Sequence, residues 1–548
     1  MPRRTLVVWA LLFAWLAAPA AGHAAVPAAA LADLASDDAD RRAAAVTALG
    51  GTREARWLEV LRVLRDGALY ARTTAGGTEL VVGGARSTRG EQEVIEVRSI
   101  DGAGLGVVPL ADLREVAADR RLRLVIKPFL DADDTRVQLA DADPAVRRGA
   151  AVKLGNQADA AAAPVIDAAL AGEQDRWVRH ALAEALALIR LAHGDAVAVT
   201  EAARALGALH SAGALPALRR LAGDGVAAPE ARAAAASAVD RIERWGMLTE
   251  VLETVFQGAS LASILLLMSL GLAIVFGLMG VINMAHGELM AIGAYATFMV
   301  QTLCRAWWPG GSDAAFLLAL PVSFLAAAAV GLVLERGVIR HLYGRPLETL
   351  LLTWGASLMI QQGLRLWFGA ANVDVAAPRW LSGGVPVMVG LQLPYNRVFI
   401  IGLAVVSVTA TYWLLFRTGA GLRIRAVTQN RTMSACLGVR AGMVDAATFA
   451  FGAGLAGLAG CALTQIGNVG PSLGQNYIVD SFMVVVTGGV GKLAGTILAA
   501  VGIGGLNKGV EPALGAVFAK VAILVGVMLF LQSRPAGLFA GRGRNADA

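Results

Sequence analysis

The residues best suited to chemistry form one short run in the apolar half of the chain. Asn283, His286 and Glu288 come directly after the charge-free segment 261–282, which is long enough to cross a bilayer. A polar group at membrane depth needs a hydrogen-bond partner or a water-lined path. The run therefore predicts part of a translocation path or gate, and a hydrogen-bonded hinge at the membrane interface is the alternative.

Uncharged polar side chains in two later apolar segments are further candidates for this path. Their hydroxyl and amide groups both donate and accept hydrogen bonds, so they could serve a neutral polar solute. They could equally satisfy one another between helices. These residues are Thr353, Gln361 and Gln362 in segment 350–369, and Thr464 and Gln465 in segment 447–466.

Motifs for metal or nucleotide chemistry are incomplete. His286 and Glu288 form one short pair without further ligands, which predicts no metal site. Residues 488–493 are similar to a phosphate loop, but Val486 replaces its first glycine and Leu493 its Ser or Thr. The three cysteines provide no disulfide framework. We expect no catalytic residue, no bound cofactor and no ATPase in this chain.

An all-α polytopic membrane bundle must position these candidates. Residues 1–250 hold 30 basic and 32 acidic side chains, whereas residues 251–548 hold only 18 and 10. The low charge density and long apolar runs of the second part predict about 8–9 spans, two of them short or re-entrant. The runs are 261–282, 288–304, 314–334, 350–369, 397–416, 447–466 and 515–532, with short pieces at 481–491 and 493–507.

Small residues predict close packing inside this bundle. Gly452, Ala456 and Gly460 recur every four residues, which places them on one helix face. Such a face lets two helix backbones approach closely.

Two signals predict the same orientation in the membrane. Residues 1–24 have the basic start, short apolar run and small residues of a signal peptide, so the following domain should lie outside the cytoplasm. Loops 335–349 and 417–446 and the C-terminal tail carry 11 basic residues, against 4 in the opposite loops. Basic loops favour the cytoplasmic side. We therefore assign residues 251–540 to the transmembrane domain and 541–548 to a cytoplasmic tail.

Residues 25–250 predict an extracytoplasmic domain of helical repeats. The stretches 37–50 and 141–155 resemble one another: each opens with an acidic turn and closes with Leu-Gly, as capped helices do. The pattern resembles HEAT-like repeats. Glycine-rich turns and short β-rich runs predict a small β insertion at about 67–127. The basic excess lies in the apolar half, which argues against nucleic-acid binding.

Several segments resemble one transporter family in the same order. They are 271–288, with Asn283 to Glu288 at its end, then 421–439, 454–457, 480–482 and 534–539. Over residues 251–540 the chain resembles permease subunits of branched-chain amino acid type ABC importers. Segments 348–355, 361–362 and 368–373, and the N-terminal domain, resemble the urea-transport branch of that family.

The resemblance implies a bacterial inner-membrane permease that imports urea or short-chain amides. It implies a heterodimer with a second permease subunit, two ATPase subunits that use ATP, a periplasmic solute-binding protein and surrounding lipid. Loop 417–446 would then dock in an ATPase and transmit its closure. The residues assigned to this coupling are Arg423, Arg425, Asn430, Arg431 and Gly438.

Other functions fit parts of the same pattern. A branched-chain amino acid permease would share the family motifs, and a passive channel for small neutral solutes would share the Gln and Thr lining. The N-terminal repeats could form a docking or sensing module, for example for the solute-binding protein.

Overall fold

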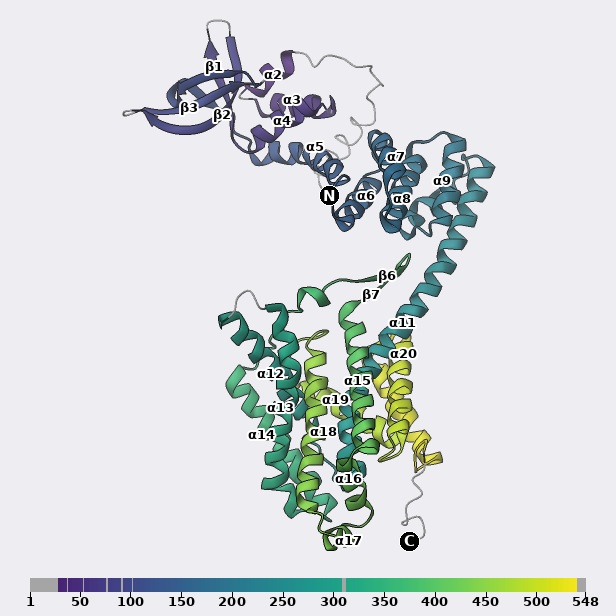
Figure 1. Cartoon of the computed structure of the whole chain (residues 1–548). Coiled ribbons are helices and arrows are strands. Elements are labelled where there is room, and N and C mark those ends of the chain that lie inside the picture. The colour runs from purple at the N-terminus through teal and green to yellow at the C-terminus, as the bar shows by residue number, and fades with distance from the viewer. Residues whose placement is uncertain are drawn as a thin grey trace, which may run out of the picture. The chain divides into compact units, whose positions relative to one another are not determined.

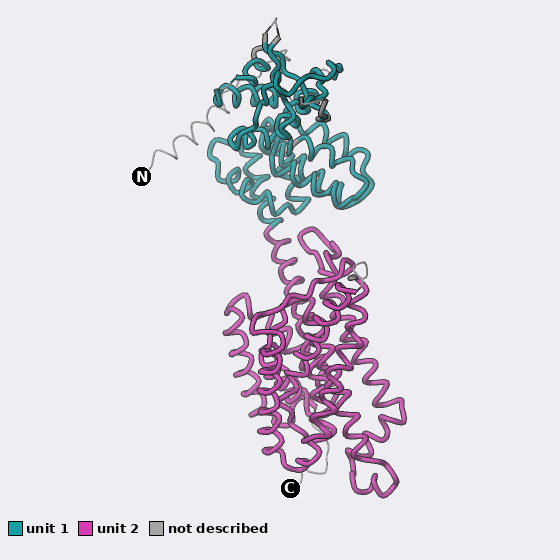
Figure 2. Tube along the Cα trace, turned by 90° about the vertical axis from the view of Figure 1, so that its left-hand side faces the viewer, with its two compact units in different colours: residues 1–242 teal, residues 243–548 magenta. Residues whose placement is uncertain are grey.

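A computed structural model describes residues 28–36, 38–52, 54–74, 77–89, 92–100, 102–307 and 312–539. The chain divides into two compact units, residues 1–242 and 243–548 (Figure 2). The predicted signal peptide, 1–24, and the predicted tail, 541–548, lie outside the described residues.

The first unit begins with three helices and a five-stranded antiparallel sheet. The helices are α2 (Ala28–Leu34), α3 (Ala39–Thr52) and α4 (Ala55–Arg65), and the sheet order is β4-β3-β2-β1-β5 (Figure 1). Successive residues of β1 face opposite sides of the sheet: Leu69 and Ala71 join the helical core, while Tyr70 packs with Val81 on the other face. The strands are β1 (Leu69–Thr74), β2 (Gly77–Arg89), β3 (Gln92–Ser99), β4 (Gly104–Pro109) and β5 (Leu113–Glu115).

The β region ends earlier than residue 127, the boundary predicted from the sequence. Helix α5 (Arg120–Gln138) begins after Asp119, whose carboxylate accepts a hydrogen bond from the Leu122 amide at 2.7 Å. Leu122, Ile126 and Leu130 recur every four residues and are all buried, so they form the core face of a helix.

A row of short helices follows, and three of them start at an aspartate. Asp143, Asp175 and Asp195 each accept amide hydrogen bonds from the first turn of α6, α8 and α9. Gly155 of α6 packs against the Ala185 backbone of α8, where a Cβ would lie 2.8 Å from the Ala185 Cα. The assignment to HEAT-like repeats stays a prediction. The helices are α6 (Pro144–Gln157), α7 (Ala163–Gly172), α8 (Arg176–His193), α9 (Ala196–Ala208), α10 (Leu215–Gly223) and the start of α11 (Pro229–Met279).

The second unit is a helical bundle with one β-hairpin, β6 (Gly384–Met388) and β7 (Leu391–Pro394). Five helices among the described residues are long and apolar enough to cross a membrane: Pro229–Met279, Asp313–His341, Tyr395–Arg417, Ala441–Leu463 and Leu493–Ser533. The helices after α11 are α12 (His286–Trp307), α13 (Ser312–Gly337), α14 (Pro346–Phe368), α15 (Tyr395–Arg417), α16 (Gly419–Gln429), α17 (Arg431–Cys436), α18 (Ala441–Leu463), α19 (Leu473–Gly488) and α20 (Leu493–Ser533) (Figure 1).

Two predicted element boundaries in this unit are wrong, at the ends of α11 and α18. The first apolar helix ends at Met279 because Gly280 adopts a positive φ of 68°. The predicted division between the pieces 493–507 and 515–532 is confirmed, because α20 consists of two helical stretches that meet at the non-helical Gly515 (φ 78°, ψ 160°), although the first stretch continues past residue 507. Thr464 and Gln465 follow the end of α18 instead of lying within it. The exact number of spans stays a prediction.

Candidate functional site: a polar cluster where α12 begins

The chain between α11 and α12 turns back along α11 before the next helix starts. The buried His286 ring, at the first residue of α12, places its Nε2 3.0 Å from the Met268 carbonyl oxygen. Met268 lies 11 residues before the end of α11, which corresponds to about 16 Å along a helix. Helix α12 therefore starts well inside the bundle, and residues 280–285 form non-helical backbone at that depth.

Side chains of the return segment (residues 280–285) and of α14 form hydrogen bonds to part of this non-helical backbone. Asn283 Oδ1 accepts a hydrogen bond from the Ala285 amide at 3.0 Å. Thr353 Oγ1 on α14 accepts one from the Met284 amide at 3.1 Å. Non-helical backbone at membrane depth occurs only where protein buries it or water lines it. Here the protein buries most of the segment, including Val281, Asn283 and Ala285, and polar side chains lie beside it.

The carboxylate of Glu288 is buried in the first turn of α12. Its Oε1 accepts a hydrogen bond from Ser357 Oγ at 3.1 Å, across from α14. Ser357 lies four residues after Thr353, so both hydroxyls project from one face of α14. Sequence reasoning missed Ser357, although its spacing from Thr353 could have identified it.

Three polar atoms of this cluster are buried without a hydrogen-bond partner among the described residues. They are Asn283 Nδ2, His286 Nδ1 and Glu288 Oε2. Because a carbonyl oxygen only accepts, His286 Nε2 carries the proton toward Met268, and Nδ1 of the neutral ring is an acceptor. The cluster therefore offers two acceptors and one donor to a small polar molecule.

Glycines bring a second helix start against this cluster. A Cβ on Gly287 would lie 2.6 Å from the carbonyl oxygen of Gly474, in the first turn of α19. No side chain fits between the two backbones. The positive ends of the α12 and α19 dipoles consequently lie close together beside the Glu288 carboxylate.

The predicted residues Gln361 and Gln362 have different surroundings. Gln361 is buried one turn beyond Ser357 on the same face of α14, whereas Gln362 is exposed on another face. Gln361 therefore lies on the same face of α14 as Thr353 and Ser357 of the cluster, whereas Gln362 does not.

Thr464 and Gln465 belong to a separate polar group just after the end of α18. Gln465 Nε2 donates to Thr464 Oγ1 at 3.1 Å, and Asn396 Nδ2 donates to the Gln465 carbonyl at 2.8 Å. Nearby, Gln301 bonds the Ala376 backbone through both side-chain atoms, at 2.7 and 3.0 Å. Gln301 lies 13 residues beyond Glu288, about 20 Å along α12. The predicted path residues thus form two groups.

The small residues of α18 lie at helix crossings. Gly452 faces the Gly271 backbone of α11, Gly460 faces the Met290 backbone of α12, and Ala456 is fully buried between them. These crossings hold α18 against the two helices that flank the return segment.

The predicted coupling residues lie on α16 and α17 and in the following turn. Arg423 and Asn430 are exposed, and the Asn430 side chain caps α17 by accepting from the Met433 amide at 2.9 Å. The Arg425 guanidinium lies 5.3 Å from the centroid of the Phe416 ring. Gly438 takes a positive φ of 82°, as the turn after a short helix requires.

Arg431 is tied to a network that sequence reasoning missed. It forms an ion pair with Asp445 at 2.6 Å and lies 4.6 Å over the Tyr343 ring. Tyr343 donates to Glu335 at 3.1 Å. Burial, reinforced by the carboxylates of Asp445 and Glu335, raises the pKa of Tyr343, so its hydroxyl remains a donor. Arg431 therefore links the short helices to the ends of α13 and α18.

No group of three or more His, Cys, Asp or Glu side chains able to hold a metal ion occurs among the described residues.

Comparison with known proteins then gives the family. Residues 254–532 match the family described as "Branched-chain amino acid transport system / permease component". No solved structure matches the chain.

The individual relatives are also transport permease proteins. The chain is 30% identical over 298 residues to the high-affinity branched-chain amino acid transport system permease protein BraD of Pseudomonas aeruginosa, covering 52% of this chain and 95% of that protein. It is 29% identical over 300 residues to LivH of Salmonella typhimurium, a permease protein of the same description, covering 52% and 94%. The ribose import permease protein RbsC of Escherichia coli K12 is 25% identical over 254 residues, covering 45% and 74%. The family match covers more than half of the chain, and the BraD match covers nearly all of that relative, so this chain belongs to the branched-chain amino acid transport system permease family.

Proposed function

We propose that this chain is the membrane permease subunit of an ABC importer, which moves a small polar solute into the cytoplasm. The observation that carries the proposal is the polar cluster of Asn283, His286, Glu288, Thr353 and Ser357 beside the non-helical segment 280–285. Broken helices near the bilayer centre are where transporters bind their cargo. The partially unpaired acceptors of the cluster suit a solute with N–H donors.

Branched-chain amino acids are the substrate class that the relatives support best. BraD and LivH both carry that substrate in their names, at 29–30% identity over nearly their whole length. The helix starts of α12 and α19 would favour a carboxylate, and the acceptors of the cluster would favour an ammonium group.

Urea or short-chain amides are the second candidate. Segments 348–355 and 368–373 resemble the urea-transport branch, and the family match leaves residues 1–253 outside it. A neutral amide would need only hydrogen bonds, which Asn283, Thr353 and Ser357 supply without further charge.

The proposed assembly contains this chain, a second permease subunit, two ATPases that hydrolyse ATP, and a periplasmic solute-binding protein, in a bacterial inner membrane. The surface proposed for ATPase contact is formed by exposed Arg423 together with three exposed apolar side chains on α16, α17 and the next turn: Leu422, Met433 and Leu437. Apolar side chains exposed beside a basic residue are typical of a docking surface.

Competition for uptake tests the substrate. Cells that express the complete assembly take up labelled leucine and labelled urea in separate assays, each challenged with unlabelled leucine, urea or acetamide. A branched-chain amino acid permease shows leucine uptake that urea and acetamide leave unchanged. The reverse pattern assigns the chain to urea and amides, and the absence of ATP-dependent uptake of both contradicts both substrate classes.

Solute flux through the isolated chain distinguishes a passive channel from an importer subunit. Proteoliposomes that contain only this protein are loaded with buffer and mixed with labelled solute. An importer subunit shows no flux without its ATPases. Solute flux through the isolated chain would identify a channel and contradict the proposal.

A further inference from the structure

The first unit contains a cavity of about 670 Å³ that the permease function does not use. Its walls come from α3, α4 and α5 on one side and from the segment after α6 and the end of α8 on the other. Ligand pockets in proteins have volumes of roughly 300–1,000 Å³. This cavity therefore has room for a small organic molecule.

Part of the cavity wall is apolar and rigid. The Phe129 ring packs on the backbone of Gly50, where a Cβ would meet the ring carbons. Leu58, Leu124 and Pro128 also line the cavity. An aliphatic side chain of a ligand would lie against this wall.

The rest of the wall carries both signs of charge. Lys127 and Arg136 are cationic, and Asp131 and Asp159 are anionic. A third carboxylate, Asp133, is already bound by Arg62 at 2.8 Å. Asp159 also has protein partners, since its Oδ1 accepts a hydrogen bond from the Ala161 amide at 3.1 Å and its Oδ2 faces Arg136. With two cations and two further carboxylates, the wall would repel neither end of a zwitterion but would disfavour a ligand of one sign.

Arg136 is only partly satisfied by the protein. It approaches Asp159 at 3.5 Å, with each side chain 20% exposed, and this separation is too long for a good hydrogen bond. Its Nε and Nη2 are buried without a hydrogen-bond partner among the described residues. A guanidinium in this state gains from an incoming carboxylate, which small side-chain shifts would let it bind at two points.

The edge of the cavity is held in a strained conformation. Ala158 has a positive φ of 50°, which is uncommon for a residue with a Cβ. Its carbonyl oxygen accepts a hydrogen bond from His193 Nε2 at 2.7 Å, so the end of α8 fixes the segment that carries Asp159. Strain of this kind is common at ligand-binding sites.

We propose that this cavity binds a small zwitterionic amino acid with an apolar side chain. Arg136 and Lys127 hold its carboxylate, Asp131 holds its ammonium group, and the wall around Phe129 contacts its side chain. The site is separate from the polar cluster of α12, and the proposal holds whichever solute the membrane unit carries.

Calorimetric titration of the purified full-length chain tests this site. Leucine is expected to bind saturably. 4-Methylpentanoate lacks the ammonium group and leucinamide lacks the carboxylate, so each should bind at least about tenfold more weakly, which corresponds to one lost ionic contact. Equal binding of leucine and leucinamide, or no binding of leucine, would overturn the proposal.

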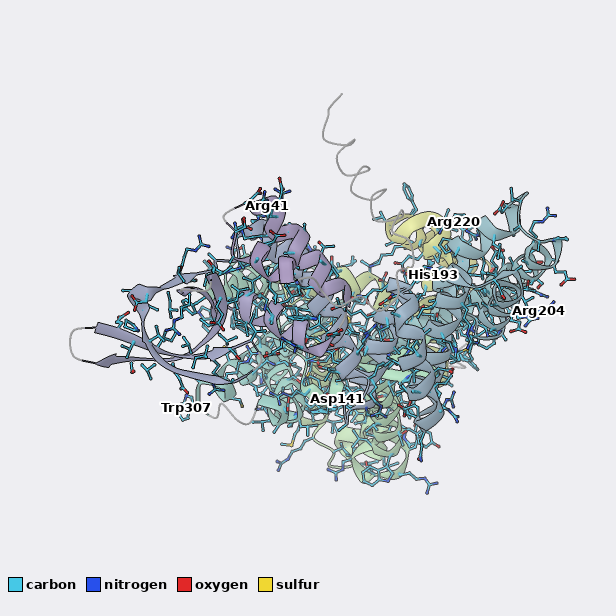
Figure 3. The ribbon with its side chains drawn as sticks, turned by 90° about the horizontal axis from the view of Figure 1, so that it is seen from above. Arg41, Asp141, His193, Arg204, Arg220 and Trp307 are labelled. Atoms are coloured by element: carbon cyan, nitrogen blue, oxygen red, sulfur yellow. The ribbon has the colours of Figure 1, made fainter. Side chains whose placement is uncertain are left out.

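Three variants locate the binding. Arg136→Gln removes the cation, and Ala160→Trp fills the cavity from an exposed position while leaving every charge in place. Both should abolish leucine binding. Arg204→Gln is the control, because Arg204 is an exposed arginine of α9 that lies apart from His193 (Figure 3).

Thermal unfolding of each variant shows whether the first unit is intact, and Ala160→Trp keeps the test decisive if Arg136→Gln unfolds. Leucine binding by folded Ala160→Trp with the affinity and stoichiometry of the wild type would place the ligand elsewhere, for example at the α12 cluster, and contradict the proposal. Uptake assays are independent of this titration, so a chain that binds leucine here but supports no transport would contradict only the permease proposal.

Discussion

At the scale of single residues, the hydrogen bond from Ser357 to Glu288 is the contact on which the candidate site depends most. Ser357→Ala leaves a buried carboxylate without its donor, and a hydrogen bond to a charged group contributes about 1.5–3 kcal/mol. We expect ATP-dependent uptake to fall by about tenfold or more. Initial uptake rates at equal membrane expression measure the effect.

The matched control for this change is Ser407→Ala on α15, which removes a buried hydroxyl that takes no part in the Ser357–Glu288 hydrogen bond. Its uptake should equal that of the wild type. Equal uptake by both variants would show that the Glu288 carboxylate does not need Ser357.

A second residue pair makes the stability of the first unit depend on pH. The Arg147 guanidinium bonds both oxygens of Glu173, at 2.8 and 3.0 Å, and lowers the pKa of Glu173 to about 2 from a usual value of 4.5. Because the folded-state pKa is lowered, the pair stabilises the fold fully above about pH 4.5 and less as the pH falls toward 2.

Arg147→Gln should therefore lower the Tm of the first unit at pH 6 by a few degrees, and by less at pH 3. Thermal unfolding of the purified chain at both values tests this, with the exposed Arg204→Gln as the control. An equal loss of Tm at the two pH values would contradict the linkage.

Local patterns identified some site residues and missed others for a physical reason. Asn283, Glu288 and Thr353 were recognisable as polar groups in apolar surroundings. Ser357 and Asp445 are equally important in the structure, but their partners Glu288 and Arg431 lie 69 and 14 residues away. Pairings of this kind depend on which helices pack together, which periodicity does not reveal.

At the scale of elements, the crossing of α12 and α18 is the closest helix contact near the site. A Cβ at Gly460 would collide with the Met290 carbonyl and lie 2.9 Å from the Ala294 amide nitrogen. Gly460→Ala should destabilise the bundle by about 1–3 kcal/mol, the usual cost of overpacking. Thermal unfolding in detergent measures the loss.

Gly402→Ala on α15 is the control for this crossing, because a Cβ there meets nothing within 4 Å. Its stability should be unchanged or slightly higher, since alanine favours helix more than glycine. A Gly460→Ala variant as stable as Gly402→Ala would show that the crossing of α12 and α18 tolerates an added methyl group, and would contradict this prediction.

The short helices α16 and α17 carry a prediction about assembly. Leu437 is 78% exposed beside the α17 end. Leu437→Glu would place a charge in the proposed ATPase contact and should abolish co-purification of the ATPases, whereas Leu437→Met should preserve it. Co-purification that survives the glutamate would move the contact to another surface.

Apolar runs predicted most membrane helices but not their junctions. The run after Lys492 appeared as two pieces because polar and small residues interrupt it, and the two helical stretches of α20 do meet at the non-helical Gly515, eight residues beyond the predicted end of the first piece. Likewise, the length of the first run gave no sign that the chain would turn back after Gly280. Backbone conformation at single glycines decides both features.

At the scale of the whole molecule, the uneven charge of the sequence corresponds to two compact units that divide at residues 242 and 243. Removal of residues 28–242 should leave uptake at saturating substrate unchanged, because the family match lies within 254–532. If the first unit docks or senses, the concentration for half-maximal uptake should rise. Uptake curves of the truncated and full-length chains test this, and identical curves would contradict such a role.

The return segment between α11 and α12 also constrains the order in which the protein can be made. The Met284 amide finds its acceptor in Thr353, and the helix that backs this region, α18, is synthesised more than 150 residues after residue 285. Until those parts emerge, segment 280–285 would expose bare peptide groups to lipid. We therefore expect the hairpin of α11 and α12 to stay near the membrane surface, or bound to insertion factors, during translation. It should reach its final depth only when nearly the whole permease has been made.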